Sequence, residues 1–132
     1  MTSPALTLYG AGQILAGTGI PTNLYVQAHI GEPGTDGTGN VATETSRVLM
    51  TRGAATTVGN SKVAENDAEV GWEDWPADET VTHFSWWDDI DAGQGNCWYV
   101  ADEADGGEVV TTGQNVTFNI GEATFTLNTY VP

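Results

Sequence analysis

The side chains that could do chemistry in this 132-residue chain are few. It contains two histidines, His29 and His83, and one cysteine, Cys97. Ser85 and Asp88 follow His83 closely, and serine, histidine and aspartate are the components of a hydrolytic triad. On an extended strand, however, Ser85 and His83 point the same way, and no G-x-S-x-G turn exposes the hydroxyl. We therefore predict no enzymatic activity and interpret His83 as a hydrogen-bonded strand residue.

Metal ligation has little support in the spacing of these residues. Neither histidine lies in an HExxH pattern, and one cysteine can form neither an internal disulfide nor a Cys-based zinc site. Two probable loops are rich in carboxylates, the ligands that calcium prefers, but neither follows the D-x-[DN]-x-[DN]-G spacing. The acids are Asp88, Asp89 and Asp91 in one loop and Asp102 and Asp105 in the other. We predict no cofactor, and calcium at one of these loops is the alternative.

The charge of the chain excludes several partners. Eighteen acidic residues oppose Arg47, Arg52 and Lys62, for a formal net charge of −15. Such a surface repels phosphate, so we expect neither a nucleic-acid nor a membrane partner. No segment approaches the roughly 18 apolar residues of a membrane-spanning helix, and the N-terminus lacks the basic start of a signal peptide. Two hypotheses explain the close pair of arginines: ion pairing with carboxylates inside the fold, or contact with an acidic partner.

Seventeen glycines, many threonines and few helix-forming residues indicate an all-β protein. We predict a β-sandwich of about seven to eight short antiparallel strands over residues 23–132. Residues 1–22 form an N-terminal arm or a short helix in this interpretation. Apolar residues recur there at three- and four-residue spacing over Ala5–Ala16, with Ser3 and Pro4 placed to cap the helix.

The centre of the predicted fold is a hairpin over Thr80–Ala101, read as TVTHFSWWDDIDAGQGNCWYVA. Large apolar side chains occupy both faces of its first strand, so both faces need a cover. We predict that Trp86 points to the core and Trp87 toward a neighbouring subunit. The alternative is that the other sheet of the same chain covers the second face.

Other strands follow from alternation of apolar and polar residues. They are Leu24–Ile30, Ser46–Thr51, Asn115–Ile120 and Ala123–Leu127. The last two are predicted to form either a hairpin or one long strand with a bulge at Gly121-Glu122. The glycine-rich segment Gly31–Asn40 is predicted to be a loop that is mobile or serves a contact.

The tryptophans raise the possibility of sugar binding. Indole faces stack on pyranose rings, and neighbouring carboxylates bind hydroxyl groups. A carbohydrate-binding module with an exposed platform of Trp72, Trp75 and Trp87 is therefore a hypothesis from a different functional class.

Two short motifs resemble a family of small virion structural proteins of tailed bacteriophages. The first is L-Y-x-x-x-H-x-x-x-P-G, and the second is V-T-H-x-x-x-x-D. The matching positions are Leu24, Tyr25, His29, Pro33 and Gly34, then Val81, Thr82, His83 and Asp88. A glycine-rich turn and a threonine-rich pair of strands near the C-terminus extend the resemblance over roughly Leu6 to Leu127. Here Thr45-Ser46-Arg47 replaces the Gly-Tyr-Ala-Arg segment that such proteins usually carry.

The resemblance implies a protein made in the host cytoplasm and built into the virion. We expect a capsid decoration, or cement, protein on the outer shell, with a tail or fibre-base component as the alternative. Its partners would be copies of itself, in a trimer with a pentamer as the alternative, and the major capsid protein or other virion proteins. The predicted contact residues are Leu6, Leu8, Tyr9, Arg47, Arg52 and Trp87.

Overall fold

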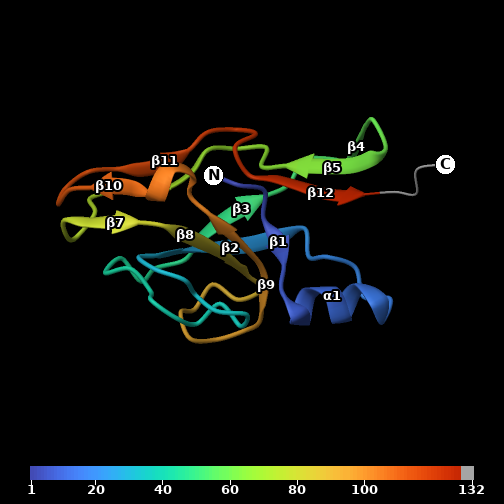
Figure 1. Cartoon of the computed structure of the whole chain (residues 1–132), viewed down its shortest axis with the longest axis horizontal. Helices are drawn as coiled ribbons and strands as arrows, with labels where there is room; N and C mark the ends of the chain where they lie inside the picture. The colour runs from blue at the N-terminus through green and yellow to red at the C-terminus, as the bar shows by residue number, and fades with distance from the viewer. Residues whose placement is uncertain (129–132) are drawn as a thin grey trace.

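The computed structural model describes residues 1–128 and confirms the all-β class, with one short α-helix (Figure 1). The largest sheet has five strands in the order β1-β9-β8-β2-β3, and every neighbouring pair is antiparallel. Its members are β1 (Ala5–Leu6), β9 (Cys97–Asp102), β8 (His83–Trp87), β2 (Asn23–His29) and β3 (Val48–Thr51). The predicted hairpin is the pair β8 and β9, which lies in the middle of this sheet.

Seven further strands in the described chain form three small sheets, ordered β12-β5-β4, β11-β6 and β10-β7. Their bounds are β4 (Thr56–Val58), β5 (Ser61–Glu65), β6 (Val70–Trp72), β7 (Glu79–Val81), β10 (Glu108–Val110), β11 (Val116–Phe118) and β12 (Thr124–Asn128). A single 3₁₀ turn, η1 (Ala104–Gly106), follows β9. The described strands outnumber the seven or eight predicted because many have only two or three residues, too few for alternation to be recognised.

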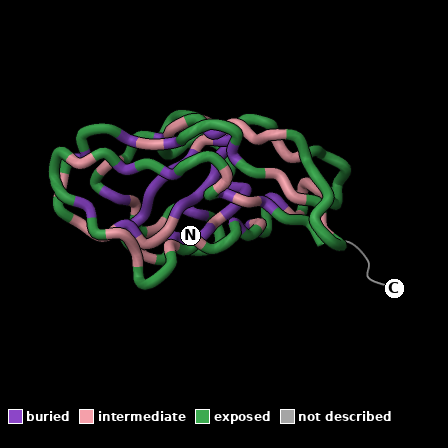
Figure 2. Tube along the Cα trace, turned by 90° about the horizontal axis from the view of Figure 1, so that it is seen from above, coloured by how far each residue is buried: buried purple, intermediate pink, exposed green. Residues whose placement is uncertain are grey.

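The core lies between the five-stranded sheet and a layer that β5, β6, β11 and β12 provide. Trp86 of β8 and Tyr99 of β9 both pack edge-on against Phe125 of β12, with ring centroids 5.6 and 4.7 Å apart. Phe84 contacts Phe118 of β11 in the same way, at 5.6 Å. Figure 2 shows buried segments inside a rim of exposed turns. These aromatic contacts join the two layers, as in a sandwich.

The C-terminal strands pair differently from the prediction. β11 pairs with β6 and β12 pairs with β5, so the two form neither a hairpin nor one continuous strand. The side chain of the fully buried Asn66 explains the break, because it donates to the carbonyl of Asn119 and accepts from the amides of Gly121 and Ala123. Gly121 adopts a φ of +85°, which turns the chain at that point.

The N-terminal helix α1 (Leu8–Leu15) is shorter than predicted, because residues 5–6 pair with β9 as strand β1. Thr7 is its N-cap and accepts from the amide of Gly10, so the predicted cap at Ser3-Pro4 is wrong. Tyr9 packs edge-on against Trp98 at 5.5 Å, which fixes the helix on β9. At eight residues, α1 is the longest helix in residues 1–128 and is far too short to cross a bilayer.

The two glycines of α1 give a matched pair of substitutions. A Cβ at Gly10 would lie 2.7 Å from the Trp98 carbonyl oxygen, whereas a Cβ at Gly12 would meet nothing within 4 Å. We predict that Gly10→Ala lowers the free energy of unfolding by about 1–3 kcal/mol through overpacking. We predict that Gly12→Ala raises it by about 0.5–1 kcal/mol through helix propensity. Urea unfolding measures both, and shifts in the same direction would contradict this packing.

Candidate functional site

The glycine-rich loop, defined here as residues 31–40, packs against the outer face of the five-stranded sheet. Pro33 within it is fully buried. Gly37 has a φ of +75°, and a Cβ there would lie 2.5 Å from the Cys97 sulfur and 3.1 Å from the Trp87 ring. Only glycine fits this position, on both conformational and steric grounds. The loop is therefore the cover for the outer face of β8, and the cover comes from the same chain.

A buried polar network lies beneath this loop. His29 Nδ1 lies 2.7 Å from the Gly39 carbonyl oxygen, and its Nε2 lies 2.6 Å from Ser85 Oγ. Trp87 Nε1 donates to the same Ser85 oxygen at 2.7 Å. A carbonyl only accepts, so Nδ1 carries the proton, and the neutral ring accepts the Ser85 hydroxyl proton at Nε2. Each polar atom of the network is therefore satisfied by a neutral histidine.

The contact between His29 and Ser85 has the spacing of a base and its nucleophile, but both residues are fully buried. A substrate cannot approach the serine without displacing the glycine-rich loop. Burial lowers the pKa of His29, and electrostatic interactions with His83 and Arg47 lower it further, against opposing effects of the Gly39 hydrogen bond and Glu32. Burial also raises the pKa of the Cys97 thiol to about 12, which makes it a poor nucleophile. These groups stabilise the fold.

Arg47 completes the cover over β8. Its guanidinium lies 4.0 Å from the centroid of the Trp87 ring. The same group donates to the carbonyl oxygens of Asp89 and Gln94, at 2.8 and 2.7 Å, and so ties down the turn between β8 and β9. Arg47 and Trp87 are each only 5% exposed. The prediction that Trp87 points outward is therefore wrong.

The other arginine also contacts backbone. Arg52 Nη2 donates to the carbonyls of Ile20 and Pro21, at 3.2 and 2.9 Å, and joins the segment after α1 to β3. Within residues 1–128 neither arginine lies within 4.0 Å of a carboxylate, so the hypothesis of internal ion pairing is wrong for both. Of the other predicted contact residues, Leu6 is partly buried, whereas Leu8 and Tyr9 are exposed on α1.

His83 is placed quite differently from His29. It lies at the start of β8, and its Nε2 is 2.9 Å from an Asp102 carboxylate oxygen and 3.3 Å from a Glu32 carboxylate oxygen. Its Nδ1 contacts the Thr82 hydroxyl at 2.8 Å. Among the described residues, Glu32, His83 and Asp102 are the one group of three or more potential ligands whose atoms all lie within 4.8 Å of one another.

Hydrogen bonds hold the acidic residues of the first of the two loops for which calcium is the alternative prediction. Asp88 accepts from the amide of Asn96 and from the indole of Trp98, at 2.8 and 3.2 Å, which closes the turn between β8 and β9. Asp89 accepts from the amide of Asp91 at 2.9 Å. Asp102 turns to His83, and Asp105 does not belong to that group.

The tryptophan platform is absent, because all five tryptophans are buried. Trp72 and Trp75 lie in the aromatic core, at 5.9 Å from each other and edge-on, and Trp87 lies beneath Arg47. A carbohydrate-binding site made of exposed indoles is therefore excluded at the positions predicted for it.

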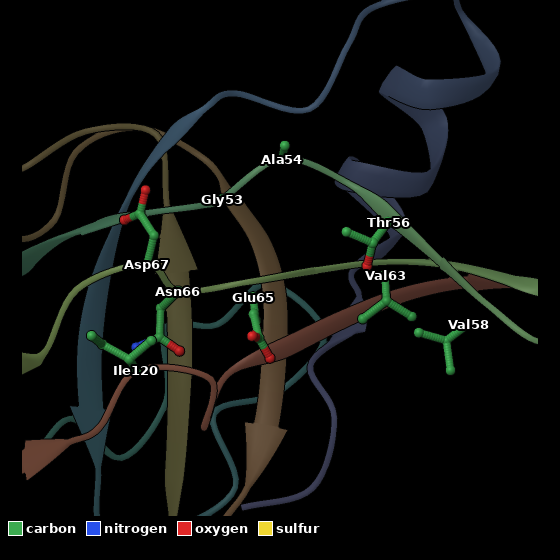
Figure 3. A pocket seen from close by; sticks show the side chains of 9 residues that line it. All are labelled: Gly53, Ala54, Thr56, Val58, Val63, Glu65, Asn66, Asp67 and Ile120. Atoms are coloured by element: carbon green, nitrogen blue, oxygen red, sulfur yellow. The ribbon is translucent and has the colours of Figure 1, made fainter.

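A surface hollow lies elsewhere, between β4, β5 and the segment at Gly53, and has a volume of about 390 Å³ (Figure 3). Its acidic side chains, Glu65 and Asp67, point in different directions in Figure 3, and Asp67 accepts from the Thr51 hydroxyl. Asn66, also in the lining, is committed to the backbone of the neighbouring turn. The lining residues therefore offer no pair of carboxylates for acid–base catalysis.

Sequence reasoning missed two partnerships: His29 with Ser85, and Glu32 with His83. The partners of the first lie 56 positions apart, and they meet because β2 pairs with β8 in the register that sets His29 opposite His83. Alternation along each strand places His29 and Ser85 on the outer faces, but the pairing register is needed to bring them together. Glu32 lies in a loop, where no periodic signal exists.

The buried network makes stability depend on pH. Because the pKa of His29 lies below its ordinary value of 6.5, the unfolded chain binds a proton more readily than the folded one. The stability present above about pH 6.5 is therefore lost progressively as the pH falls toward the folded pKa. We predict that the urea concentration at the unfolding midpoint falls less between pH 7.5 and 5.5 in His29→Gln than in wild type. A chelator in both samples removes any effect of bound metal ions. Carboxylates titrate in both proteins, so parallel curves would rule out this role for His29.

Comparison with known proteins identifies the family. The model of the podophage GP4 fiber I protein gp80 family matches residues 13–126, which is most of the chain and includes α1 in part and strands β2 to β11 in full. No curated protein matches the chain. The match supports the resemblance to phage virion proteins, and it favours the fibre alternative over capsid decoration. The chain belongs to the podophage GP4 fiber I protein gp80 family, a family of phage virion proteins.

Proposed function

We propose that this chain is a non-enzymatic structural subunit of the tail-fibre apparatus of a phage virion. The observation that carries the proposal is the family match over residues 13–126, because the name of the family describes a phage fibre protein. The subunit would assemble with copies of itself and with other virion proteins. Repetition of weak contacts by symmetry then holds it in the particle.

The use of the reactive side chains supports a structural role. The pair of His29 and Ser85 is sealed beneath the glycine-rich loop, Cys97 is buried, and both arginines fix backbone segments. These contacts join stretches of chain that are distant in sequence and make a rigid fold. A virion subunit needs rigidity and repeated surfaces, and it needs no cleft for a substrate.

The helix α1 supplies the best candidate surface for self-association. Leu8 and Leu15 are 80% and 90% exposed, although leucine side chains favour burial. They are seven residues apart, two helical turns, so they lie on one face of α1. A net charge of −15 opposes close approach of two copies over most of the surface. The two leucines are the most exposed large apolar side chains in the described chain, so α1 offers an apolar contact against this repulsion, and a trimer is the assembly we favour.

The location of the subunit in the particle tests the fibre assignment. We expect an antibody against the purified chain, or a density map of the virion, to place it in the tail-fibre region at low copy number. Regular labelling over the whole head would overturn this proposal and would restore capsid decoration.

The exposed leucines test self-association. We predict that the double variant Leu8→Ser/Leu15→Ser associates about tenfold or more weakly than wild type, because each buried leucine contributes about 1.5–3 kcal/mol. Sedimentation equilibrium measures the change, and higher salt should strengthen association of the wild type by screening the charge. A matched control is Val109→Thr, 72% exposed on β10 at the opposite end of the molecule from α1 (Figure 1). Equal association of all three proteins would exclude α1 as the contact.

A further inference from the structure

The cluster of Glu32, His83 and Asp102 has a property that the structural role leaves unexplained. Two carboxylates from separate segments converge on one imidazole nitrogen, at 3.3 and 2.9 Å from Nε2. A neutral imidazole has at most one proton at that nitrogen to share between them, and a protonated imidazole balances only one of two negative charges. A divalent cation at this position balances both carboxylates while the imidazole stays neutral.

We propose that Glu32, His83 and Asp102 bind a divalent transition-metal ion with the ligand preferences of zinc. One imidazole nitrogen and two carboxylate oxygens are a ligand set that zinc accepts, whereas calcium and magnesium prefer oxygen ligands throughout. The spacing also fits. Ligands of a zinc ion with bonds of about 2.0–2.1 Å lie roughly 2.9 to 3.4 Å apart, depending on whether the geometry is octahedral or tetrahedral. The two contacts of Nε2 fall in that range.

The surroundings orient two of the ligands. Thr82 Oγ1 lies 2.8 Å from His83 Nδ1 and can accept its proton, which leaves Nε2 free to coordinate. Glu32 accepts from the amide of Gly34 through its other oxygen, at 3.1 Å. The Glu32 backbone carbonyl in turn accepts from the Asn40 side chain at 2.8 Å. Loop and strand therefore hold the two side chains toward each other.

The site is open to ions from solvent. The side chains of Glu32 and Asp102 are 71% and 62% exposed, while that of His83 is 15% exposed. Glu32 and Asp102 also line a surface hollow of about 380 Å³ beside β1. Water can therefore complete the coordination from this side. Three protein ligands with open positions make a site of moderate affinity that exchanges its ion.

The consequence of binding is a cross-link between distant segments. The ligands come from the glycine-rich loop, the start of β8 and the end of β9, and His83 and Asp102 are already paired in register. Binding would fasten the loop over the buried network of His29. The unfolded chain does not hold the three residues together, so zinc would bind the folded state preferentially and raise its stability.

Calorimetric titration of the untagged, metal-free chain with zinc chloride tests the proposal. We expect one ion per chain in wild type, at least tenfold weaker binding in His83→Gln, and weaker binding in Glu32→Gln and Asp102→Asn. Matched controls are Asp91→Asn and Asp105→Asn, which remove an exposed carboxylate outside the cluster and should bind as wild type does. Calcium and magnesium at equal concentration should neither bind comparably nor displace zinc.

Thermal unfolding with and without zinc supplies a second measurement. Zinc should raise the midpoint of wild type and of both controls, but not that of His83→Gln. Glu32→Gln keeps the result interpretable if His83→Gln folds poorly, because Glu32 lies in an exposed loop position outside the strands. Absence of zinc binding in wild type, equal binding in all variants, or equal binding of calcium would each overturn the proposal. In the first case the cluster is an ion pair, and in the other two the binding is general to an acidic surface.

Discussion

The constraint on which the rest of this structure depends is that strand β8 has no face in solvent. Phe84 and Trp86 enter the aromatic core on one side, and Ser85 and Trp87 are buried on the other. The second face carries an indole N–H and a hydroxyl, which cannot be buried without partners. His29 of β2, the glycine-rich loop and Arg47 supply those partners and close the surface. The chain therefore covers its own central strand, and it needs no neighbouring subunit to do so.

This cover buries the residues whose types suggest chemistry. His29 Nε2 and Ser85 Oγ lie 2.6 Å apart, as in a catalytic pair. In this fold the hydrogen bond satisfies polar atoms that are buried between the paired strands β2 and β8. A buried donor or acceptor without a hydrogen-bond partner lowers the free energy of unfolding by about 1–3 kcal/mol, so the stability of the fold depends on this network. His83 escapes this constraint because it is the first residue of β8, where its side chain is 15% exposed.

Sequence periodicity located strands β2, β8, β9 and β12, and it identified the inward face of β2. Periodicity failed where the orientation of a side chain or the pairing of a strand depends on a residue far away in the sequence. The sequence predicts an interface position for Trp87 because Arg47, 40 positions earlier, gives no signal that it stacks on the indole. The break between β11 and β12 depends on one side chain, Asn66, whose hydrogen bonds reach 53 to 57 positions along the chain. Glycine has a low helix propensity, yet the missing side chain of Gly10 lets α1 contact β9.

Self-coverage of β8 also changes where assembly contacts must be sought. If the outer face of β8 needed a neighbour, subunit contact would be built into the core and the fold would be obligately oligomeric. Because the face is closed, β8 needs no neighbour to cover it, and contacts are left to surface features such as α1, whose two outward leucines are 80% and 90% exposed. Such contacts are individually weak against a charge of −15. In the assembly proposed above, symmetry in the virion would multiply such contacts, so a highly acidic subunit would stay dispersed before assembly and hold its place afterwards.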